Sequence, residues 1–265
     1  MPGLFAGIDI GSTTTKVVVV SDAGVCGRAI GPTGANCRAT ARTLYDEVLS
    51  TCEGGEDDVV SVVTTGYGRR LVDFRTGIVS EITANARGAG FLAAASGPVR
   101  TIVDVGGQDS KAISLDDDGR ITDFAMNDKC AAGTGRFLEV MARLLELDLD
   151  AIGEMALRAE TPRTITSLCA VFAESEVIGL LSEGVPVPEI VAGIHISVAA
   201  RVGALVRRIG LRTPVLFDGG AALNPGLRKA IERNLDVHLL VPDHPQFVPA
   251  TGAALLAAHN PKTPD

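Results

Sequence analysis

The spacing of apolar residues predicts short β-strands and helices in the first part of the chain. Short runs rich in Val, Ile and Leu, bounded by Gly, Asp and Ser, predict strands over residues 4–10, 16–21, 24–30 and 59–65. Apolar positions at helical spacing predict helices over residues 38–52 and 83–95. Ser96-Gly97-Pro98 breaks the last of these helices and ends a first unit.

A second series of strands begins at residue 100 and repeats the order of the first. Apolar runs predict strands over residues 100–105, 110–115 and 120–126. With position 9 aligned to position 104, an offset of 95 residues (104 − 9), the two series share Asp9/Asp104, Gly11/Gly106, Lys16/Lys111, Asp22/Asp117 and Gly24/Gly119. Because the match runs through a turn and the hairpin after it, the sequence predicts an internal duplication.

The remainder of the chain is predicted to be mainly helical. Helical spacing predicts helices over residues 132–146, 170–183, 187–209, 225–234 and 246–259. Short apolar runs predict two further strands, over residues 214–217 and 237–241. We therefore expect an α/β protein of two domains, one formed by residues 1–97 with a closing helix in 246–265 and the other by residues 98–245.

Composition excludes several classes of protein. The chain has 265 residues, 46% of them hydrophobic, with a formal charge of −8, which argues against a basic nucleic-acid-binding surface. No uninterrupted apolar run approaches the ~20 residues that cross a bilayer, and the N-terminus has no signal-peptide pattern, so we expect a cytoplasmic protein without a membrane partner. The five cysteines form no C-x-x-C pair, which predicts reduced thiols.

Both duplicated turns have the chemistry of a phosphate site. In DIGSTTTK and DVGGQDSK a strand ends in Asp-x-Gly and turns tightly into the next strand, which presents backbone N–H groups and side-chain donors around a small concavity. In the first turn, the predicted phosphate-binding residues are Gly11, Ser12, Thr13, Thr14 and Lys16. In the second turn they are Gly106 and Gly107.

Three polar residues of these turns are the predicted catalytic residues. Asp9 and Asp104 are expected to hold hydrated Mg²⁺, because this cation prefers carboxylate, water and phosphate oxygens. Gln108 is suited to orienting a water molecule. An ordinary β-hairpin would explain either turn alone, but the duplication favours a ligand site. A third Gly loop, with Gly219 and Gly220 after an apolar strand, is expected to approach the nucleoside, although alone it is a weak signal.

Two cysteines lie just before predicted helices. Cys130 precedes the segment Ala131-Ala132-Gly133-Thr134-Gly135, and Cys169 precedes the helix predicted over 170–183. The positive end of a helix favours a thiolate. On spacing alone, the ordinary role of a free cysteine as a small buried apolar residue is favoured. A four-iron cluster usually needs four thiolates, which two copies of the chain around a two-fold axis would supply.

The chain resembles the activator family of 2-hydroxyacyl-CoA dehydratases and the related ATPase subunits of benzoyl-CoA reductase. The resemblance covers nearly the whole chain and lies in the segments GIDIGSTTTK, TTGYGR, DVGGQDSK, MNDKCAAGTGRFLEVMA, CAVFAESEVI and DGGAALNPG. The segment around Cys130 is highly specific, whereas the Asp-Gly turns alone indicate only the wider superfamily of acetate kinase, sugar kinases, Hsp70 and actin.

The resemblance implies a fold, a set of cofactors and a set of partners. It implies an actin-like (ribonuclease H-like) duplicated fold with ATP in a cleft between the domains, and it adds Gly133 and Thr134 to the cofactor-binding residues. It also implies a homodimer with one bridging [4Fe-4S] cluster, whose ligands are Cys130 and Cys169 of each chain. ATP hydrolysis then drives an electron from the cluster to an acyl-CoA dehydratase or reductase, with ferredoxin or flavodoxin as the electron donor.

Other interpretations remain open. A benzoyl-CoA reductase subunit is the near alternative, and Ala84-Asn85, where many relatives have Cys-His, weakens assignment to one subfamily. A small-molecule kinase of the same fold would transfer the γ-phosphoryl group and contain no iron. A nucleotide-dependent switch would bind ATP tightly with negligible turnover. Cys26, Cys37 and Cys52 are interpreted as structural or incidental, and the four His residues lack metal-site spacing.

Overall fold

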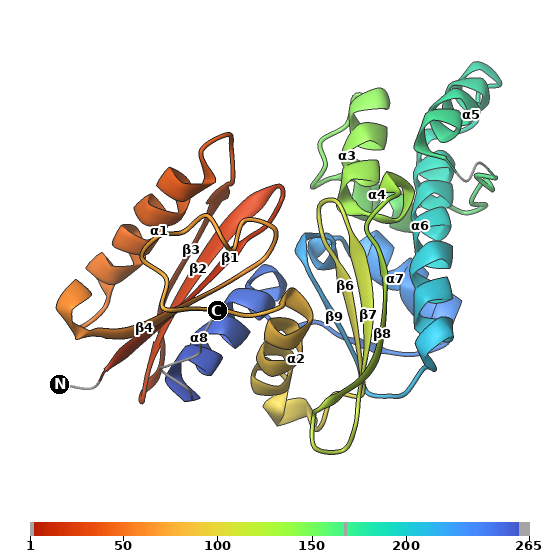
Figure 1. Cartoon of the computed structure of the whole chain (residues 1–265). Helices are drawn as coiled ribbons and strands as arrows, with labels where there is room; N and C mark the ends of the chain where they lie inside the picture. The colour runs from red at the N-terminus through yellow and green to blue at the C-terminus, as the bar shows by residue number, and fades with distance from the viewer. Residues whose placement is uncertain (1–2, 167–168, 260–265) are drawn as a thin grey trace. The chain divides into compact units, whose positions relative to one another are not determined.

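The structure is a computed structural model that describes residues 3–166 and 169–259 (Figure 1). The chain divides into two compact units. Unit 1 consists of the described residues within Met1–Pro98, Asp117–Ile121 and Gln246–Asp265, and unit 2 of those within Val99–Asp116 and Thr122–Pro245. Each unit has its own sheet and its own apolar core.

Unit 1 is built on a mixed sheet of five strands in the order β3-β2-β1-β4-β5. The strands are β1 (Leu4–Ile10), β2 (Thr14–Ser21), β3 (Gly24–Pro32), β4 (Val59–Thr65) and β5 (Gly77–Ile78). β1, β2 and β3 form the predicted antiparallel meander, whereas β4 runs parallel to β1 and β5 parallel to β4. β5 was not predicted, because two residues carry no alternating pattern.

Helices cover both faces of this sheet, which explains why the central strands are apolar on both sides (Figure 1). Helix α1 (Cys37–Thr51) buries Leu44, Tyr45 and Val48 against one face. Helices α2 (Glu81–Leu92) and α8 (Val248–His259) pack on each other, and the alanines of α8 lie against the other face. Short 3₁₀ turns at Glu56–Asp58 and Ala94–Ser96 complete this unit.

Unit 2 repeats the sheet order of unit 1. Its strands lie in the order β10-β9-β6-β7-β8, with bounds β6 (Thr101–Val105), β7 (Ser110–Leu115), β8 (Ile121–Asn127), β9 (Val215–Asp218) and β10 (Leu239–Leu240). β6 and β7 are antiparallel, β9 is parallel to β6, and β10 is parallel to β9. The predicted duplication is therefore confirmed at the level of the whole sheet, since each meander is followed by two parallel strands.

The described residues of unit 2 include five helices, and the longest of them carries much of the core. They are α3 (Gly135–Leu144), α4 (Ile152–Leu157), α5 (Ala170–Ser182), α6 (Val187–Ile209) and α7 (Pro225–Leu235), with 3₁₀ turns at Ala131–Gly133 and Gly220–Leu223. Helix α6 is long and apolar enough to cross a membrane, but 67% of its apolar window is buried inside the protein, as in the core helix of a soluble protein.

One prediction about these helices was wrong in detail, and one helix was not predicted. The helix predicted over residues 132–146 is divided, because the N–H groups of Gly135 and Arg136 donate to the carbonyls of Gly106 and Gly107 and a new helix starts there. Helix α4 was not predicted, because six residues are too few to show a clear period. It packs against α6 and α7 and closes the side of the core next to them.

Candidate nucleotide-binding turns and cluster cysteines

The first candidate site is the turn between β1 and β2 of unit 1. Asp9 is buried near the end of β1, and its Oδ2 atom lies 3.1 Å from Nζ of Lys16, which faces it in the β1–β2 register. The N–H of Gly11 donates to the carbonyl of Thr14 (3.1 Å) and closes the turn. Ser12 and Thr13 lie exposed at the tip. The predicted residues are thus together, and the hydroxyls and N–H groups of the tip are open to an anion.

The environment of Asp9 contains an unsatisfied polar atom. Asp9 Oδ1 is buried and has no hydrogen-bond partner within residues 3–166 and 169–259, and the same holds for the hydroxyl of Thr65. Thr65 pairs with Asp9 in the register of β1 and β4. A buried polar atom without a partner usually marks a place for water or an ion. The sequence did not indicate Thr65, because it is one of several β-branched residues in an apolar strand.

The second candidate site is the turn between β6 and β7 of unit 2, and it repeats the geometry of the first. The N–H of Gly106 donates to the carbonyl of Asp109 (3.0 Å), and Nζ of Lys111 lies 3.1 Å from Oδ2 of Asp104. Lys111 also lies 2.8 Å from Oδ2 of Asp109, a carboxylate that the first turn lacks. Asp104 and Lys111 are almost fully buried, with side chains 5% and 2% exposed.

A glycine with positive φ closes each site from the neighbouring parallel strand. Gly66, after β4, has φ +86°, and a Cβ atom there would lie 2.5 Å from Oδ1 of Asp9. Gly219, after β9, has φ +83°, and a Cβ atom there would lie 2.6 Å from Oδ1 of Asp104. Only glycine fits both the backbone conformation and the space. The sequence pattern indicates a Gly loop at Gly219 but no ligand role for Gly66, its structural counterpart.

The third loop adds a carboxylate beside the second turn. Asp218 is fully buried and pairs with Asp104 in the register of β6 and β9. Gly219 and Gly220 follow it directly, and the N–H of Gly219 donates to the carbonyl of Pro245. Gly219 therefore lies against the second turn, and Asp218 brings a further acidic group that the sequence pattern did not indicate.

Three other predicted residues of unit 2 lie at or beside the second turn. Gln108 is exposed at its tip, where its amide is free to contact a ligand. Gly133 and Thr134 are buried, and the hydroxyl of Ser110 donates to the carbonyl of Gly133. This hydrogen bond ties Gly133 to Ser110, the first residue of β7, beside the second turn.

The two candidate cluster ligands are exposed free thiols. Cys169 is the N-cap residue of α5, whereas Cys130 precedes the three-residue 3₁₀ turn Ala131–Gly133 rather than α3 itself. The amide of Asn127 donates to the carbonyl of Cys130 (2.8 Å) and fixes that loop. Exposure excludes the alternative role of a small buried apolar residue for both cysteines. No group of three or more His, Cys, Asp or Glu side chains within the described ranges is arranged to hold a metal.

Helix α5 presents apolar side chains to solvent next to Cys169. Val171 and Phe172, in its first turn, are 65% and 67% exposed, and Ile178 and Leu181 are also exposed. Large exposed apolar side chains in one region mark an interaction surface. The cysteine at the start of α5 therefore lies beside a surface that favours a partner.

Comparisons with known proteins find relatives over nearly the whole chain. Residues 6–257 match the BadF/BadG/BcrA/BcrD ATPase family. The chain is 44% identical over 255 residues, covering 95% of this chain and 93% of the relative, to the 2-hydroxyisocaproyl-CoA dehydratase activator of Clostridioides difficile. It is 35% identical over 265 residues, 96% of this chain and 92% of the relative, to a benzoyl-CoA reductase subunit of Thauera aromatica.

A solved structure shows the same fold over nearly the whole chain. The activator of the 2-hydroxyisocaproyl-CoA dehydratase from Clostridium difficile, with bound ADPNP, superposes with a TM-score of 0.90 at 41% identity. The match covers 98% of this chain and 96% of that structure. The predicted actin-like fold is therefore confirmed.

Proposed function

Because the chain belongs to the BadF/BadG/BcrA/BcrD ATPase family, we propose that it is an ATP-driven electron-transfer activator of a 2-hydroxyacyl-CoA dehydratase. The observation that carries the proposal is the pairing of two kinds of site in one chain. Each unit has a phosphate-type turn with a buried Asp–Lys pair, and unit 2 also has two exposed thiols. A phosphoryl-transferring kinase would need the turns but not the thiols.

ATP is the nucleotide that these turns would bind. The open N–H and hydroxyl groups of Ser12 and Thr13 suit phosphate oxygens, and a structurally similar activator has bound ADPNP. Asp104 and Asp218, which are partners in the register of β6 and β9, would hold hydrated Mg²⁺, which usually keeps several waters and takes one or two carboxylates plus phosphate. The cation would neutralise charge that develops on the phosphates. Gln108 would orient the attacking water, and Asp9 would hold its own water or the cation through Oδ1.

The cluster would be held by Cys130 and Cys169. The fit is supported by the exposure of both thiols and by the helix N-terminus behind Cys169, which stabilises a thiolate. Two thiols are half of the usual ligand set, so a second copy of the chain would supply the others on a two-fold axis. The bound cluster would supply one low-potential electron at a time. The exposed apolar residues at the start of α5 would be covered in that homodimer.

The proposal requires two further protein partners. An acyl-CoA dehydratase would receive the electron, and ferredoxin or flavodoxin would deliver it. ATP would act as the energy source, and no phosphoryl group would be transferred to a substrate. The acyl-CoA substrate would bind only to the dehydratase.

The test is anaerobic purification followed by iron and sulfide analysis and a measurement of mass in solution. We expect four irons per dimer, with Cys130→Ala and Cys169→Ala each losing the iron and retaining nucleotide binding. Cys37→Ala, a half-buried thiol in unit 1, is the matched control and should keep its iron. Iron-free protein, or a monomer with a full cluster, would contradict the proposal.

A benzoyl-CoA reductase subunit is the second candidate. It is supported by the 35% identity to the Thauera aromatica reductase subunit. This identity is lower than the 44% identity to the dehydratase activator, so the reductase subunit ranks second. The two candidates predict the same iron content and the same ATP hydrolysis. They are separated by adding the purified protein with ATP and reductant to each partner enzyme and measuring which one becomes active.

A further inference from the structure

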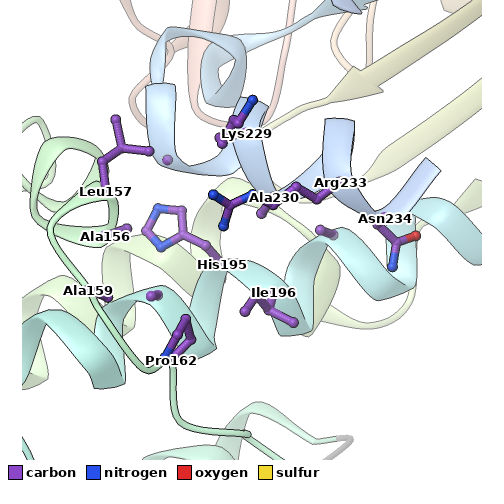
Figure 2. Close-up of a pocket in the computed structure, with 13 residues that line it drawn as sticks. Ala156, Leu157, Ala159, Pro162, His195, Ile196, Lys229, Ala230, Arg233 and Asn234 are labelled. Atoms are coloured by element: carbon purple, nitrogen blue, oxygen red, sulfur yellow. The ribbon is translucent and has the colours of Figure 1, made fainter. Parts of the chain in front are cut away.

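Unit 2 contains a cavity that none of the roles above uses. It has a volume of about 290 Å³ and lies between α6, α7, the end of α4 and the segment that follows α4, with walls that include Leu157, Pro162 and Ile196 (Figure 2). This volume corresponds to about ten water molecules at liquid density, so the cavity suits a small ligand. Much of its wall is apolar, because alanines of both helices line it.

Two cations on α7 give the cavity its charge. Lys229 and Arg233 both line it and lie one helical turn apart, and Figure 2 shows the guanidinium of Arg233 reaching across the cavity toward His195. Like charges at this spacing destabilise a helix by a few tenths of a kcal/mol, about 0.2–0.5. Within the part of the chain that the structure describes, Arg233 makes no ion pair. None of the described residues that line the cavity is acidic.

The carboxylate that pairs with Lys229 also pairs with other groups. Glu232 lies 3.6 Å from Lys229, but it also lies 3.5 Å from Arg228 and 3.1 Å from His238 and accepts the N–H of Leu239. Although burial opposes the shift, this hydrogen bond and these charges lower the pKa of Glu232, so the carboxylate stays ionised among them. Because the single negative charge of Glu232 is shared among these groups, it does not neutralise the positive charge at the cavity.

The cations could instead serve only to stabilise the C-terminal end of α7, where positive side chains interact favourably with the helix dipole. The direction of Arg233 argues against that role. Helical side chains lean toward the N-terminus of their helix, and Arg233 follows this rule by extending over the preceding turn near Ala230. It thus points away from the last carbonyls and into the cavity.

Two uncharged polar residues, His195 and Asn234, also line the cavity. His195 is buried, with Nδ1 2.7 Å from the carbonyl of Val191 and Nε2 3.1 Å from Oδ1 of Asn224. Burial lowers the pKa of His195, so the ring is neutral near pH 7. Oδ1 of Asn234 accepts from Arg207. The charges that face a ligand are therefore those of Lys229 and Arg233.

We propose that this cavity binds a small organic anion, with its carboxylate or phosphate on Lys229 and Arg233 and its short apolar part against Ile196 and the alanines. The planar guanidinium of Arg233 offers two parallel N–H donors to either anion. The bound charge also removes the repulsion between the two cations. The site is independent of the phosphate turns, since no residue of those turns lines it.

The test is titration calorimetry of the full-length protein, purified anaerobically, with three probes of matched shape: butyrate, butyl phosphate and butan-1-ol. We expect saturable binding of one ligand per chain for at least one anion, and an affinity at least about tenfold lower for the alcohol. Preference for butyl phosphate or for butyrate identifies which anion the site takes. Binding of the alcohol as tightly as the anions overturns the proposal.

Substitutions of the two cations test whether the anion binds in this cavity. Arg233→Gln and Lys229→Gln should each weaken anion binding by about tenfold or more. Arg208→Gln removes an equal charge from an exposed position of α6 that does not line the cavity, so it should bind within about twofold of the unmodified chain. Circular dichroism confirms that each variant is folded. Equal affinity in all three variants, or no saturable anion binding to the unmodified chain, overturns the site.

Discussion

The two phosphate-type turns share a backbone but differ in charge. In unit 1, one buried carboxylate, Asp9, faces one cation, Lys16, and the neighbouring parallel strand ends in Thr65. In unit 2, Lys111 contacts both Asp104 and Asp109, and the neighbouring strand ends in Asp218. The first turn is therefore balanced, whereas the second has more acidic groups than its one lysine neutralises.

This difference suggests that the two turns took different roles after duplication, one in binding phosphate and the other in binding a cation. Hydroxyls and N–H groups next to a neutral pair suit phosphate, and an excess of carboxylates suits a divalent cation. The glycine and the Asp–Lys pair are kept in both copies, because both depend on the shared backbone. The residues that set the net charge have changed.

The largest expected effect is on stability and separates the two lysines. Lys111→Met leaves two buried carboxylates without their cation, so the free energy of unfolding should fall by about 3–5 kcal/mol. Lys16→Met removes the partner of one carboxylate, and its side chain is 14% exposed, so the loss should be about 1–2 kcal/mol. Urea unfolding measures both, and equal losses would show that the extra carboxylates of unit 2 do not depend on Lys111.

The next effect concerns ATP hydrolysis. Asp104→Asn should lower kcat by about 10²-fold or more, because it weakens the carboxylate set that we assign to Mg²⁺. Asp9→Asn should have a smaller effect on kcat. Asp123→Asn, on the exposed part of β8, is the control and should leave turnover unchanged. Iron content should be the same in all three variants. A larger loss of turnover in Asp9→Asn would reverse the proposed roles.

The glycines test whether the two sites are built alike. Gly66→Ala and Gly219→Ala should each lower the free energy of unfolding by about 1–3 kcal/mol, because the backbone there has positive φ and the added Cβ atom would meet both the neighbouring Asp and a backbone carbonyl oxygen.

Gly24→Ala and Gly119→Ala are matched controls for the glycine variants. Both positions also have positive φ, but they have nothing within 4 Å of the added atom, so only the strain of about 1 kcal/mol applies. Chemical unfolding compares the four variants. If all four variants lose the same free energy of unfolding, the close approach of Gly66 and Gly219 to the aspartates does not contribute to the loss.

The smallest expected effect concerns the contact between Asn224 and His195 in unit 2. Asn224 caps α7 directly after the Gly219 loop and contacts His195, whereas a loop of turns follows Gly66 in unit 1. Because burial lowers the pKa of His195, the unfolded chain binds a proton more readily than the folded chain below about pH 6.5. Stability should therefore fall as pH decreases from about 6.5, by at most about 1.4 kcal/mol per pH unit.

His195→Gln should flatten this pH dependence while keeping a polar contact to Asn224. His259→Gln, at the exposed end of α8, is the control and should preserve the slope. Thermal unfolding between pH 5 and pH 7.5, at about half-unit steps, gives the comparison. An unchanged slope in His195→Gln would assign the pH dependence to other groups.

The strands and the repeated turn could be predicted from the sequence, and the reason is local. β1, β4 and β7 have the predicted bounds, because apolar runs between Gly and Asp leave few alternatives. The Asp–Lys pairs follow from the fixed register of a tight hairpin, in which Asp9 faces Lys16 and Asp104 faces Lys111. Contacts between residues that are close in sequence could thus be predicted from the sequence.

The partners of those turns could not be predicted, because they come from distant strands. Thr65 and Gly66 reach Asp9 only because β4 lies parallel to β1, and Asp218 reaches Asp104 only because β9 lies parallel to β6. The exposure of Cys130 and Cys169 and the cavity beside Arg233 also depend on how helices pack. The sequence by itself determined the duplicated turns and their ligand chemistry, because these depend on local spacing. The tertiary structure decided the charge of each site, because pairing between distant strands determines which side chains lie beside each turn.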